Sequence, residues 1–325
     1  MKTKILAKLR DEKGYVSGQA LCNEFGVSRT AIWKAINRLK QEGYEIEAVQ
    51  NKGYRLVNVP EILSQKELLS IRKTQWLGNE IIYYDEVDST NNAAKRLAEE
   101  GYGHGTIVVS DAQTGGRGRR GRSWSSPAGV GIWMTYILRP EQLLPANASM
   151  ITLVMGLAVA KGLEEATDTH VSIKWPNDIV MNGKKVCGTL TEMSAQMDYI
   201  NYLVVGSGIN VFNKEFPQEL SEKATSLYIE TKKEFHRAEI IETIAEKFEE
   251  YYDIFMQTED MSRLKNEYND MLVNRGGQVR VEGRESFDGN ARGINERGEL
   301  IVDTWEARRL VSSGEVSVRG VYGYV

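Results

Sequence analysis

A run of alternating glycines and arginines between Gln113 and Trp124 constrains the fold of this chain more than any other feature. The run reads QTGGRGRRGRSW and holds four glycines and four arginines. A strand pattern precedes it at 106–110 and another follows it at 131–138, so the run joins two strands. A P-loop or a Rossmann motif would need a helix that opens on glycine, and no GxxxxGK[ST] sequence is present. Any anion bound here must therefore be held by arginine side chains and loop amides.

The residue types in this run indicate what such a loop binds. Glycine allows a backbone to come close to a ligand and to adopt positive φ. Arginine offers a planar fork of N–H donors that matches phosphate and carboxylate. This composition suits a polyanion that must be enclosed and later released. The alternative is a solvated arginine-rich loop or an RGG-like contact with RNA, since such runs are common in flexible nucleic-acid-binding segments.

Charge is unevenly distributed along the chain. The formal net charge is −4, yet residues 1–58 hold 11 Lys and Arg against 6 Asp and Glu. A basic segment on an acidic body predicts an anionic partner for that segment alone. Cys22 and Cys187 are far apart and belong to no CxxC motif, so a reducing compartment is expected. The three histidines form no ligand pattern, and no structural metal site is expected.

The sequence gives no sign of secretion or of a membrane span. The amino-terminal stretch MKTKILAKLR lacks the apolar core of a signal peptide. The longest apolar run, Met150–Ala160, is shorter than the roughly 20 residues that a membrane-spanning helix needs. A soluble cytoplasmic protein without a membrane partner is the expectation.

The basic segment predicts a winged helix-turn-helix. Helical patterns at 4–9 and 17–25 precede a third helix that begins after Ser28, and Gly26 lies in the turn before it. Two strand patterns flank Asn51-Lys52-Gly53 and predict a wing. This segment is similar to the DNA-binding domains of bacterial repressors, in which the third helix lies in the major groove. The alternative is a winged helix that serves only in protein contact.

The resemblance implies which residues of this segment meet DNA. They are expected on the outward face of the third helix and on the wing, where lysine and arginine would contact backbone phosphates. The DNA-binding candidates are Ser28, Arg29, Thr30, Lys34, Asn37, Lys52 and Arg55.

Residues 80–270 read as strands with a few helices, which is typical of an α+β domain. A strand at 81–87 leads into DSTNN, where Asp88 or Ser89 is expected to cap a helix. A helix at 149–165 is apolar nearly all round at its centre and should lie beneath a sheet. Asn182-Gly183 joins two strand patterns and predicts a type I′ hairpin. The helix at 237–256 is expected to be a solvated cover.

Residues 271–325 predict a small β-barrel of SH3-like size, with turns at 276–277, 289, 298 and 314. Glu315, Ser317 and Arg319 would share one strand face, because side chains alternate along a strand. The alternative is a cross-strand ion pair on a solvated barrel. The predicted domains are residues 1–60, a linker with a short helix at 61–79, a central domain at 80–270 and this β domain at 271–325.

Four motifs in order connect these segments to one family. They are the strand-to-helix sequence DSTN, the loop GRGRRGRSW, the sequence KWPND and the hairpin KKVCGTLTE. Together they resemble bacterial biotin protein ligases over the whole chain, and with the winged segment they resemble the bifunctional form that also represses biotin synthesis. The resemblance implies the fold class: α+β, with a winged helix-turn-helix, a central class II synthetase-like mixed and antiparallel sheet with helices, and an SH3-like barrel. The implied enzyme makes biotinoyl-AMP from biotin and ATP, then transfers biotin to a lysine of a biotin carboxyl carrier domain.

The resemblance also implies roles for individual residues. Biotin would be held by Ser89, Thr90, Asn91, Gln113, Arg117, Gly118, Arg119, Lys174 and Gly188. The nucleotide would be held by Gly116, Arg117, Gly118, Arg119, Arg120, Arg122, Trp124, Asn177 and Arg319. Lys174 and Arg119 would be catalytic, because negative charge grows on the α-phosphate as biotin attacks and fixed cations stabilise that charge.

Two positions depart from the family pattern, and the metal is incompletely specified. Gly115 stands where alanine is usual, which predicts a looser loop, and Thr189 stands where an aliphatic residue is usual, which predicts a hydroxyl near the biotin pocket. Mg²⁺ is the expected cofactor of ATP, to screen the departing pyrophosphate, although no carboxylate cluster identifies its ligands. Asp178 is a candidate for ordering Lys174 or the metal, and equally an ordinary residue at the start of a hairpin.

The resemblance also implies a form of regulation, and two alternative functions stay open. The adenylate-loaded enzyme would form a homodimer and occupy operator DNA, with biotinoyl-AMP as corepressor. A lipoate or octanoyl ligase of the same fold would share the lysine-containing motif, but explains the GRGRRGR loop and the winged segment less well. A ligand-sensing transcription factor without catalysis would differ from an enzyme in releasing no pyrophosphate from ATP.

Overall fold

The structure, a computed structural model, describes residues 1–283, 285–314, 316–320 and 324–325. Its contacts divide the chain into two compact units, one of residues 1–73 with 236–242 and one of residues 74–235 with 243–325. Glu315, which was expected on a strand face with Ser317 and Arg319, lies outside the described residues. The finer domain boundaries at 60, 79 and 270 stay a prediction.

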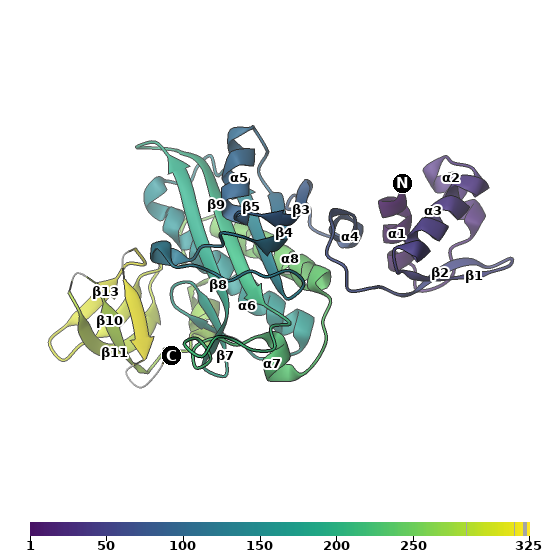
Figure 1. The fold of residues 1–325 in the computed structure, drawn as a ribbon. Helices are drawn as coiled ribbons and strands as arrows, with labels where there is room; N and C mark the ends of the chain where they lie inside the picture. Colours follow the sequence, from purple (N-terminus) through teal and green to yellow (C-terminus); the bar gives the residue numbers. More distant parts are fainter. Residues whose placement is uncertain (284, 315, 321–323) are drawn as a thin grey trace. The chain divides into compact units, whose positions relative to one another are not determined.

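The first unit begins with a group of helices and a hairpin (Figure 1). They are α1 (Lys2–Asp11), α2 (Gly18–Phe25), α3 (Arg29–Gln41), β1 (Glu45–Val49) and β2 (Gly53–Asn58). The Ser17 and Ser28 side chains accept hydrogen bonds from backbone N–H groups three residues on and so cap α2 and α3. Gly26 ends α2 in the left-handed conformation, at φ 64°. The predicted winged helix-turn-helix is confirmed.

A fourth helix, α4 (Gln65–Ile71), belongs to the same unit. Ser64 caps it, and it lies within residues 61–79, where a linker with a short helix was expected. Glu67 is only 2% exposed; its carboxylate forms an ion pair with Arg10 and accepts a hydrogen bond from the Tyr44 hydroxyl. A buried carboxylate is tolerated only when such partners replace its water. This buried pair fixes α4 to α1.

The second unit is built on a seven-stranded sheet. In chain order the strands are β3 (Ile81–Val87), β4 (Thr106–Gln113), β5 (Gly131–Leu138), β6 (Ser172–Lys174), β7 (Asp178–Met181), β8 (Lys184–Ala195) and β9 (Ile200–Asn210). Their order across the sheet is β3-β4-β5-β9-β8-β7-β6. Only β3 and β4 pair in parallel, so the sheet is mixed as predicted. Asn182 and Gly183 both have positive φ, at 49° and 78°, as the type I′ turn between β7 and β8 requires.

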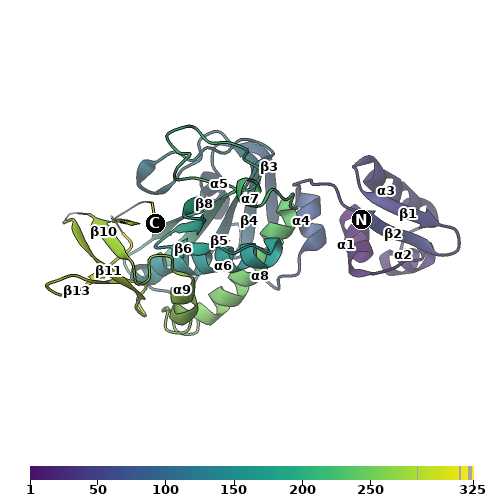
Figure 2. The same cartoon turned by 90° about the horizontal axis from the view of Figure 1, so that it is seen from below.

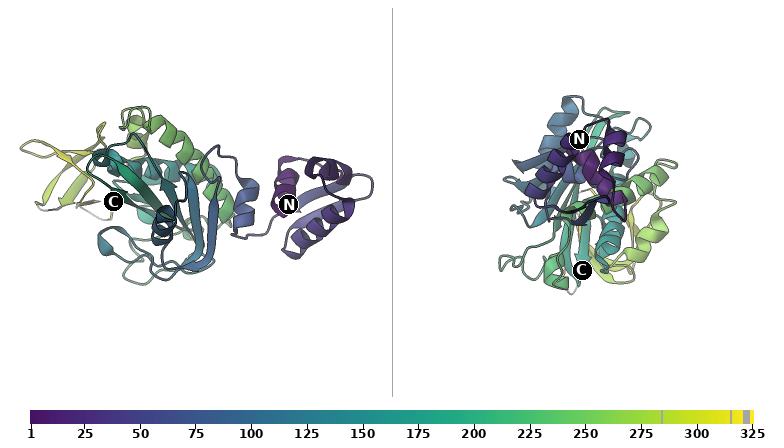
Figure 3. Two further views of the ribbon diagram at one scale, coloured as in Figure 1. Left: turned by 90° about the horizontal axis from the view of Figure 1, so that it is seen from above. Right: turned by 90° about the vertical axis from the view of Figure 1, so that its right-hand side faces the viewer.

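Helices cover both faces of this sheet because side chains alternate along each strand. On β5, Ile137 packs with α5 (Thr90–Glu99), while its neighbour Tyr136 meets Phe248 of α8 (Arg237–Phe255) at 5.0 Å between ring centroids. Helix α6 (Ile151–Thr167) lies with α8 on one face of the sheet (Figures 2 and 3). The shorter helices are α7 (Leu227–Thr231) and α9 (Lys265–Met271).

One of these helices differs from its sequence-based description, and a second agrees with it. The expected solvated cover, α8, buries a full apolar face that includes Ile244 and Phe248, and its Glu249 carboxylate accepts hydrogen bonds from the backbone N–H groups of residues 75–77. The apolar segment Pro145–Thr167 is long enough to cross a membrane by length and composition, but 72% of its apolar window is buried inside the protein. Its contacts with the sheet identify it as a core helix.

Residues 278–320 form a five-stranded antiparallel sheet in the order β13-β12-β11-β10-β14. The strands are β10 (Gln278–Glu282), β11 (Phe287–Ile294), β12 (Leu300–Asp303), β13 (Arg308–Val311) and β14 (Ser317–Gly320). The turn predicted at Gly289 is wrong, because Gly289 lies inside β11 and faces Val302 and Asp303 of β12. Gly276 and Gly298 do turn the chain, with φ of 83° and 70°. The predicted α+β class with a small terminal β domain is confirmed.

Candidate active site

Strand register brings three segments together on one face of the seven-stranded sheet. Lys174 of β6 pairs with Asp178 of β7, Asp178 pairs with Gly188 of β8, and Gly188 pairs with Gly208 of β9. Directly paired residues project to the same face. The KWPND sequence, the KKVCG hairpin and the strand at 200–210 therefore form one continuous floor.

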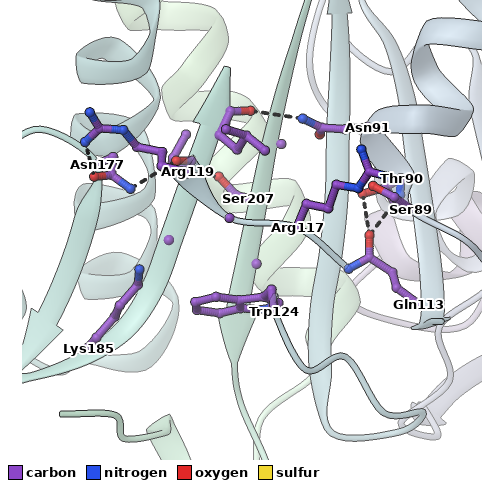
Figure 4. A pocket seen from close by; sticks show the side chains of 16 residues that line it. Ser89, Thr90, Asn91, Gln113, Arg117, Arg119, Trp124, Asn177, Lys185 and Ser207 are labelled. Carbon is purple, nitrogen blue, oxygen red and sulfur yellow. Dashed lines mark hydrogen bonds between the residues drawn. The ribbon is translucent and has the colours of Figure 1, made fainter. Parts of the chain in front are cut away.

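The glycine-arginine loop lies over the glycine part of this floor. An added Cβ at Gly208 would be 2.6 Å from Trp124 Nε1, and one at Gly188 would be 3.3 Å from the same indole. The missing side chains thus make room for the ring, which Figure 4 shows beside Lys185. Backbone bonds fix the loop at its base: Trp124 N–H donates to the Gly116 carbonyl at 2.8 Å, and Gly115 N–H to the Asp88 carbonyl at 2.7 Å. The looser loop expected from Gly115 stays a prediction.

The DSTN motif starts α5, but not by the capping that was expected. Ser89 occupies the cap position without a side-chain cap bond, and the Asp88 carboxylate pairs with Asn92 and Arg96 instead. The orphan N–H of Thr90 donates to Gln113 Oε1 at 2.8 Å, and the Thr90 hydroxyl donates to the same oxygen at 3.1 Å. Gln113 of β4 therefore caps α5 from outside the helix, which connects the DSTN motif to the loop.

Asn91 is held in a buried hydrogen-bond network. Its Nδ2 donates to Glu192 Oε2 at 2.8 Å and to the Leu190 carbonyl at 3.2 Å, while its Oδ1 accepts from the Thr135 hydroxyl at 2.8 Å. Gly206 lies opposite, and a Cβ there would be 2.0 Å from Asn91 Oδ1. Glycine at 206 is what permits this approach.

Arg119 connects the loop to the hairpin and to the small β domain. Its Nη1 donates to Asn177 Oδ1 at 2.9 Å, and its Nη2 donates to the carbonyls of Ser313 and Gly314. Burial lowers the pKa of its guanidinium below the usual value, although arginine stays charged. A guanidinium fixed at both ends is prepared to meet an anion without reorganising.

Lys174 supplies a second buried cation. It is 5% exposed, and burial lowers the pKa of its ammonium to about 8; nearby Lys185, Arg319 and Arg122 act in the same direction, and Asp178 opposes them. Lys185 forms an ion pair with Asp178 at 2.6 Å. Clustered cations with a single carboxylate among them make this end of the floor an anion site.

A partly open pocket lies above the floor, lined by residues of the DSTN motif, the glycine-arginine loop and strands β8 and β9. Eleven of its lining residues carry predicted roles or were noted as departures from the family pattern: Ser89, Thr90, Asn91, Gln113, Arg117, Gly118, Arg119, Trp124, Asn177, Gly188 and Thr189. Figure 4 shows lining side chains around the pocket, among them Asn91, Gln113, Arg119 and Trp124.

Other predicted residues do not line this pocket. They are Gly116, Arg120, Arg122, Lys174 and Arg319. Gly116 is buried beneath the Trp124 carbonyl, Arg120 and Arg122 are exposed, and Arg319 pairs with Glu282 at 3.2 Å. Arg122 and Arg319 still lie close enough to lower the pKa of Lys174.

Sequence reasoning assigned no role to five lining residues: Lys185, Leu190, Gly206, Ser207 and Gly208. Leu190 and Lys185 lie in the hairpin motif, and the paired glycines of β9 were a visible signal, because glycine inside a strand marks close approach of another group. The Thr189 hydroxyl lies 3.2 Å from the Ser207 hydroxyl, with which it shares a hydrogen bond. Among the described residues no group of three His, Cys, Asp or Glu could hold a metal.

The predicted DNA-binding residues lie on the surface of the first unit. Ser28, Arg29, Thr30, Lys34, Lys52 and Arg55 are exposed, and Asn37 is half-buried. Four of them have protein partners: Ser28 caps α3, Arg29 donates to Gln19 of α2, Arg55 pairs with Glu47 on the wing, and the Lys52 ammonium lies 5.6 Å from the centroid of the Tyr15 ring. Trp33 is 56% exposed on the same helix.

Comparison with known proteins agrees with this architecture. Residues 2–55 match a helix-turn-helix domain, residues 83–210 the biotin/lipoate A/B protein ligase family, and residues 276–319 the biotin protein ligase C-terminal domain. The bifunctional ligase/repressor BirA of Bacillus subtilis is 40% identical to the chain over 307 residues, which cover 94% of each protein. The chain belongs to the bifunctional biotin ligase/repressor family.

Other biotin ligases are similar to this chain in sequence and in structure. The ligase/repressor BirA of Escherichia coli is 29% identical over 97% of this chain and 96% of its own. The structure of the biotin protein ligase from Aquifex aeolicus in complex with biotin and ATP is 35% identical, with a TM-score of 0.67, and covers 74% of this chain and 99% of that one. The predicted family, enzyme class and bifunctional organisation are confirmed: this protein is a biotin ligase with a helix-turn-helix repressor domain.

Proposed function

We propose that the pocket above β8 and β9 binds biotin and that its cationic end binds the phosphates of ATP. The observation that carries this assignment is the register that places Lys174, Asp178, Gly188 and Gly208 in one row beneath the loop. The glycine part of this row, with the indole of Trp124, suits the uncharged rings of biotin. The cations at the other end suit its carboxylate and the α-phosphate.

The proposed reaction has two steps. The biotin carboxylate attacks the α-phosphate of ATP, pyrophosphate leaves, and biotinoyl-AMP forms. The amine of a carrier-domain lysine then attacks the acyl carbon and displaces AMP. Arg119 and Lys174 would stabilise the negative charge on the α-phosphate in the first step, from positions that are already fixed by burial and hydrogen bonds.

Mg²⁺ is proposed to arrive with the nucleotide, since Mg²⁺ usually keeps several waters and is bound through substrate phosphates. The protein offers little else for it: Asp178, the carboxylate nearest the cations, already contacts Lys185 and Asn177. We therefore assign no residue to the metal. We further propose a cytoplasmic enzyme whose acceptor is a biotin carboxyl carrier domain.

One experiment tests the enzymatic assignment. The protein is incubated with ATP, Mg²⁺ and labelled biotin without an acceptor, and bound biotinoyl-AMP and released pyrophosphate are measured. We expect both in equal amounts. Adenylation of lipoate or octanoate in place of biotin would keep the fold and overturn the substrate, and no pyrophosphate from any acid would leave a ligand-sensing transcription factor.

Gly206→Ala is expected to weaken biotin binding by roughly 10- to 100-fold. The added methyl would meet Asn91 Oδ1, and a buried polar group that loses its partners costs about 1–3 kcal/mol. Titration calorimetry with biotin measures the effect. Gly156→Ala is the matched control, because a Cβ at Gly156 has no atom within 4 Å. Wild-type affinity in the Gly206→Ala protein would show that this approach of Asn91 is not needed for binding.

We propose that α3 and the wing of the first unit contact operator DNA, and that biotinoyl-AMP promotes dimerisation and repression. Two copies would read two half-sites, as winged repressors commonly do. The exposed basic residues on α3 and the wing, in a segment with a net charge of +5 from its 11 basic and 6 acidic residues, support this assignment.

Lys52→Ala is expected to weaken DNA binding and to flatten its salt dependence. Loss of one phosphate contact should reduce the slope of log K against log salt concentration by about 0.9. The measurement is fluorescence anisotropy on duplex DNA across a salt series, with biotin and ATP present. Lys233→Ala, an exposed lysine outside the first unit, is the control. An unchanged slope for Lys52→Ala would remove the wing from the DNA interface.

A further inference from the structure

Tyr324 lies at the cationic end of the site, beside Lys174 and Asp178, where no sequence motif predicted a tyrosine. The Lys174 ammonium is 3.2 Å from the centroid of the Tyr324 ring. The Tyr324 hydroxyl donates a hydrogen bond of 2.5 Å to Asp178 Oδ2. One side chain thus contacts both the lysine and the carboxylate of the KWPND motif.

Packing around Val325 fixes the position of Tyr324. A Cβ added at Gly320 of β14 would be 1.8 Å from the Val325 carbonyl oxygen, and one at Gly183 in the β7–β8 turn would be 3.5 Å from a Val325 methyl. Val325 therefore lies in close contact with both the small β domain and the hairpin that carries Asp178. The packing of Val325 thus holds the neighbouring Tyr324 next to Lys174 and Asp178.

Asp178 is the expected ion-pair partner of Lys174, yet the pair does not form. The two residues are direct partners in the β6–β7 register and project to the same face. Among the described residues, however, no carboxylate lies within 4.0 Å of the Lys174 ammonium. The two oxygens of Asp178 are taken by other groups: Oδ2 by the Tyr324 hydroxyl, and Oδ1 by Lys185 at 2.6 Å and Asn177 at 3.0 Å.

The absence of a Lys174–Asp178 ion pair leaves the Lys174 ammonium available to an anionic substrate. The charged groups near Lys174 are Asp178, Lys185, Arg319 and Arg122. If Asp178 turned to Lys174, it would neutralise the cation that a phosphate must meet. An aromatic face attracts the ammonium without forming a hydrogen-bonded ion pair. An anionic substrate can therefore readily replace the ring as the partner of the ammonium.

We propose that Tyr324 is a positioning residue for adenylation: its hydroxyl keeps Asp178 from pairing with Lys174, and its ring holds the ammonium ready for the anion. This inference rests on the proposed role of Lys174. The tyrosine itself forms no bond to substrate and transfers no proton. It acts on the reaction through the carboxylate and the lysine.

Tyr324→Phe tests the hydroxyl while keeping the ring. With its hydrogen bond lost, Asp178 is free to pair with Lys174, and we expect kcat for biotin-dependent pyrophosphate release to fall about tenfold, with KM for biotin changed less than twofold. Breaking a hydrogen bond to a charged group typically has an effect of this size. The alkaline limb of the pH profile should move to higher pH, because a paired ammonium holds its proton more tightly. Tyr199→Phe, a half-exposed tyrosine at the β8–β9 turn, is the control.

A double-mutant cycle separates positioning from a structural role. In an Asp178→Asn protein there is no carboxylate to neutralise Lys174, so adding Tyr324→Phe should change kcat by less than twofold. The proposal would be overturned by an equal loss of kcat in both backgrounds, or by a Tyr324→Phe enzyme with wild-type kcat. A Tyr324→Phe enzyme with higher kcat and lower KM for ATP would also overturn it, because Tyr324 would then obstruct the nucleotide. Failure of the underlying function is distinct: a Lys174→Gln enzyme with full activity would remove Lys174 from the reaction whatever Tyr324 does.

Discussion

Lys174→Gln is expected to reduce the rate of biotinoyl-AMP formation by about 10²–10³, the cost of removing one fixed donor from a developing anion. The loss should appear in kcat for pyrophosphate release, because the ammonium acts on charge that grows only in the transition state. Lys184→Gln, at the first residue of β8 and outside the pocket lining, is the matched control. A Lys174→Gln enzyme with the wild-type rate would show that this lysine does not contact the reacting phosphate.

The same lysine predicts a pH dependence with a defined sign. Burial lowers the pKa of Lys174 to about 8, so the ammonium is charged below that pH and loses its proton above it. Since the cation is the active form, adenylation by the wild-type enzyme should decline as pH rises through about 8. Lys174→Arg, which stays charged throughout this range, should lack that decline, whatever its absolute rate. An identical alkaline limb in both proteins would assign the limb to another group.

Arg119→Ala is expected to leave biotin binding within about twofold of wild type and to release biotinoyl-AMP roughly 10- to 100-fold faster. The guanidinium lies at the phosphate end of the proposed site, away from Asn91 and Gln113, and a hydrogen bond to a charged group contributes about 1.5–3 kcal/mol. Its loss also frees Asn177 and the carbonyls of Ser313 and Gly314, which should make the loop less well fixed.

Retention of the adenylate measures this effect directly. Labelled biotinoyl-AMP is formed on the enzyme, excess unlabelled biotin is added, and the bound label and its hydrolysis are followed over time. Arg297→Ala, an exposed arginine in the turn after β11, is the control. An Arg119→Ala protein that protects the adenylate as long as wild type would contradict the assignment.

Much of the architecture followed from local chemistry. Serine before α3 caps that helix through its side chain, and glycine after α2 and Asn182-Gly183 between two strands adopt positive φ, which few other residues do. The motif order was enough to identify the family and the two activities. Capping was less predictable: Gln113, which is 23 residues from Thr90, accepts the bond that Asp88 or Ser89 was expected to accept. Residues far apart in sequence compete for the same N–H, and only their folded positions decide between them.

By itself, the sequence determined the winged segment, the mixed sheet, the small β domain and most of the residues around the pocket, because turn chemistry, alternation and glycine content are local properties. Only the tertiary structure decided how the cationic end is built. Strand register set Lys174 opposite Asp178, and the packing of Val325 against Gly320 and Gly183 brought Tyr324 between them. Lys174 and Asp178 are close in sequence, but Tyr324 is 146 positions from Asp178, and no local pattern records that these two residues will meet.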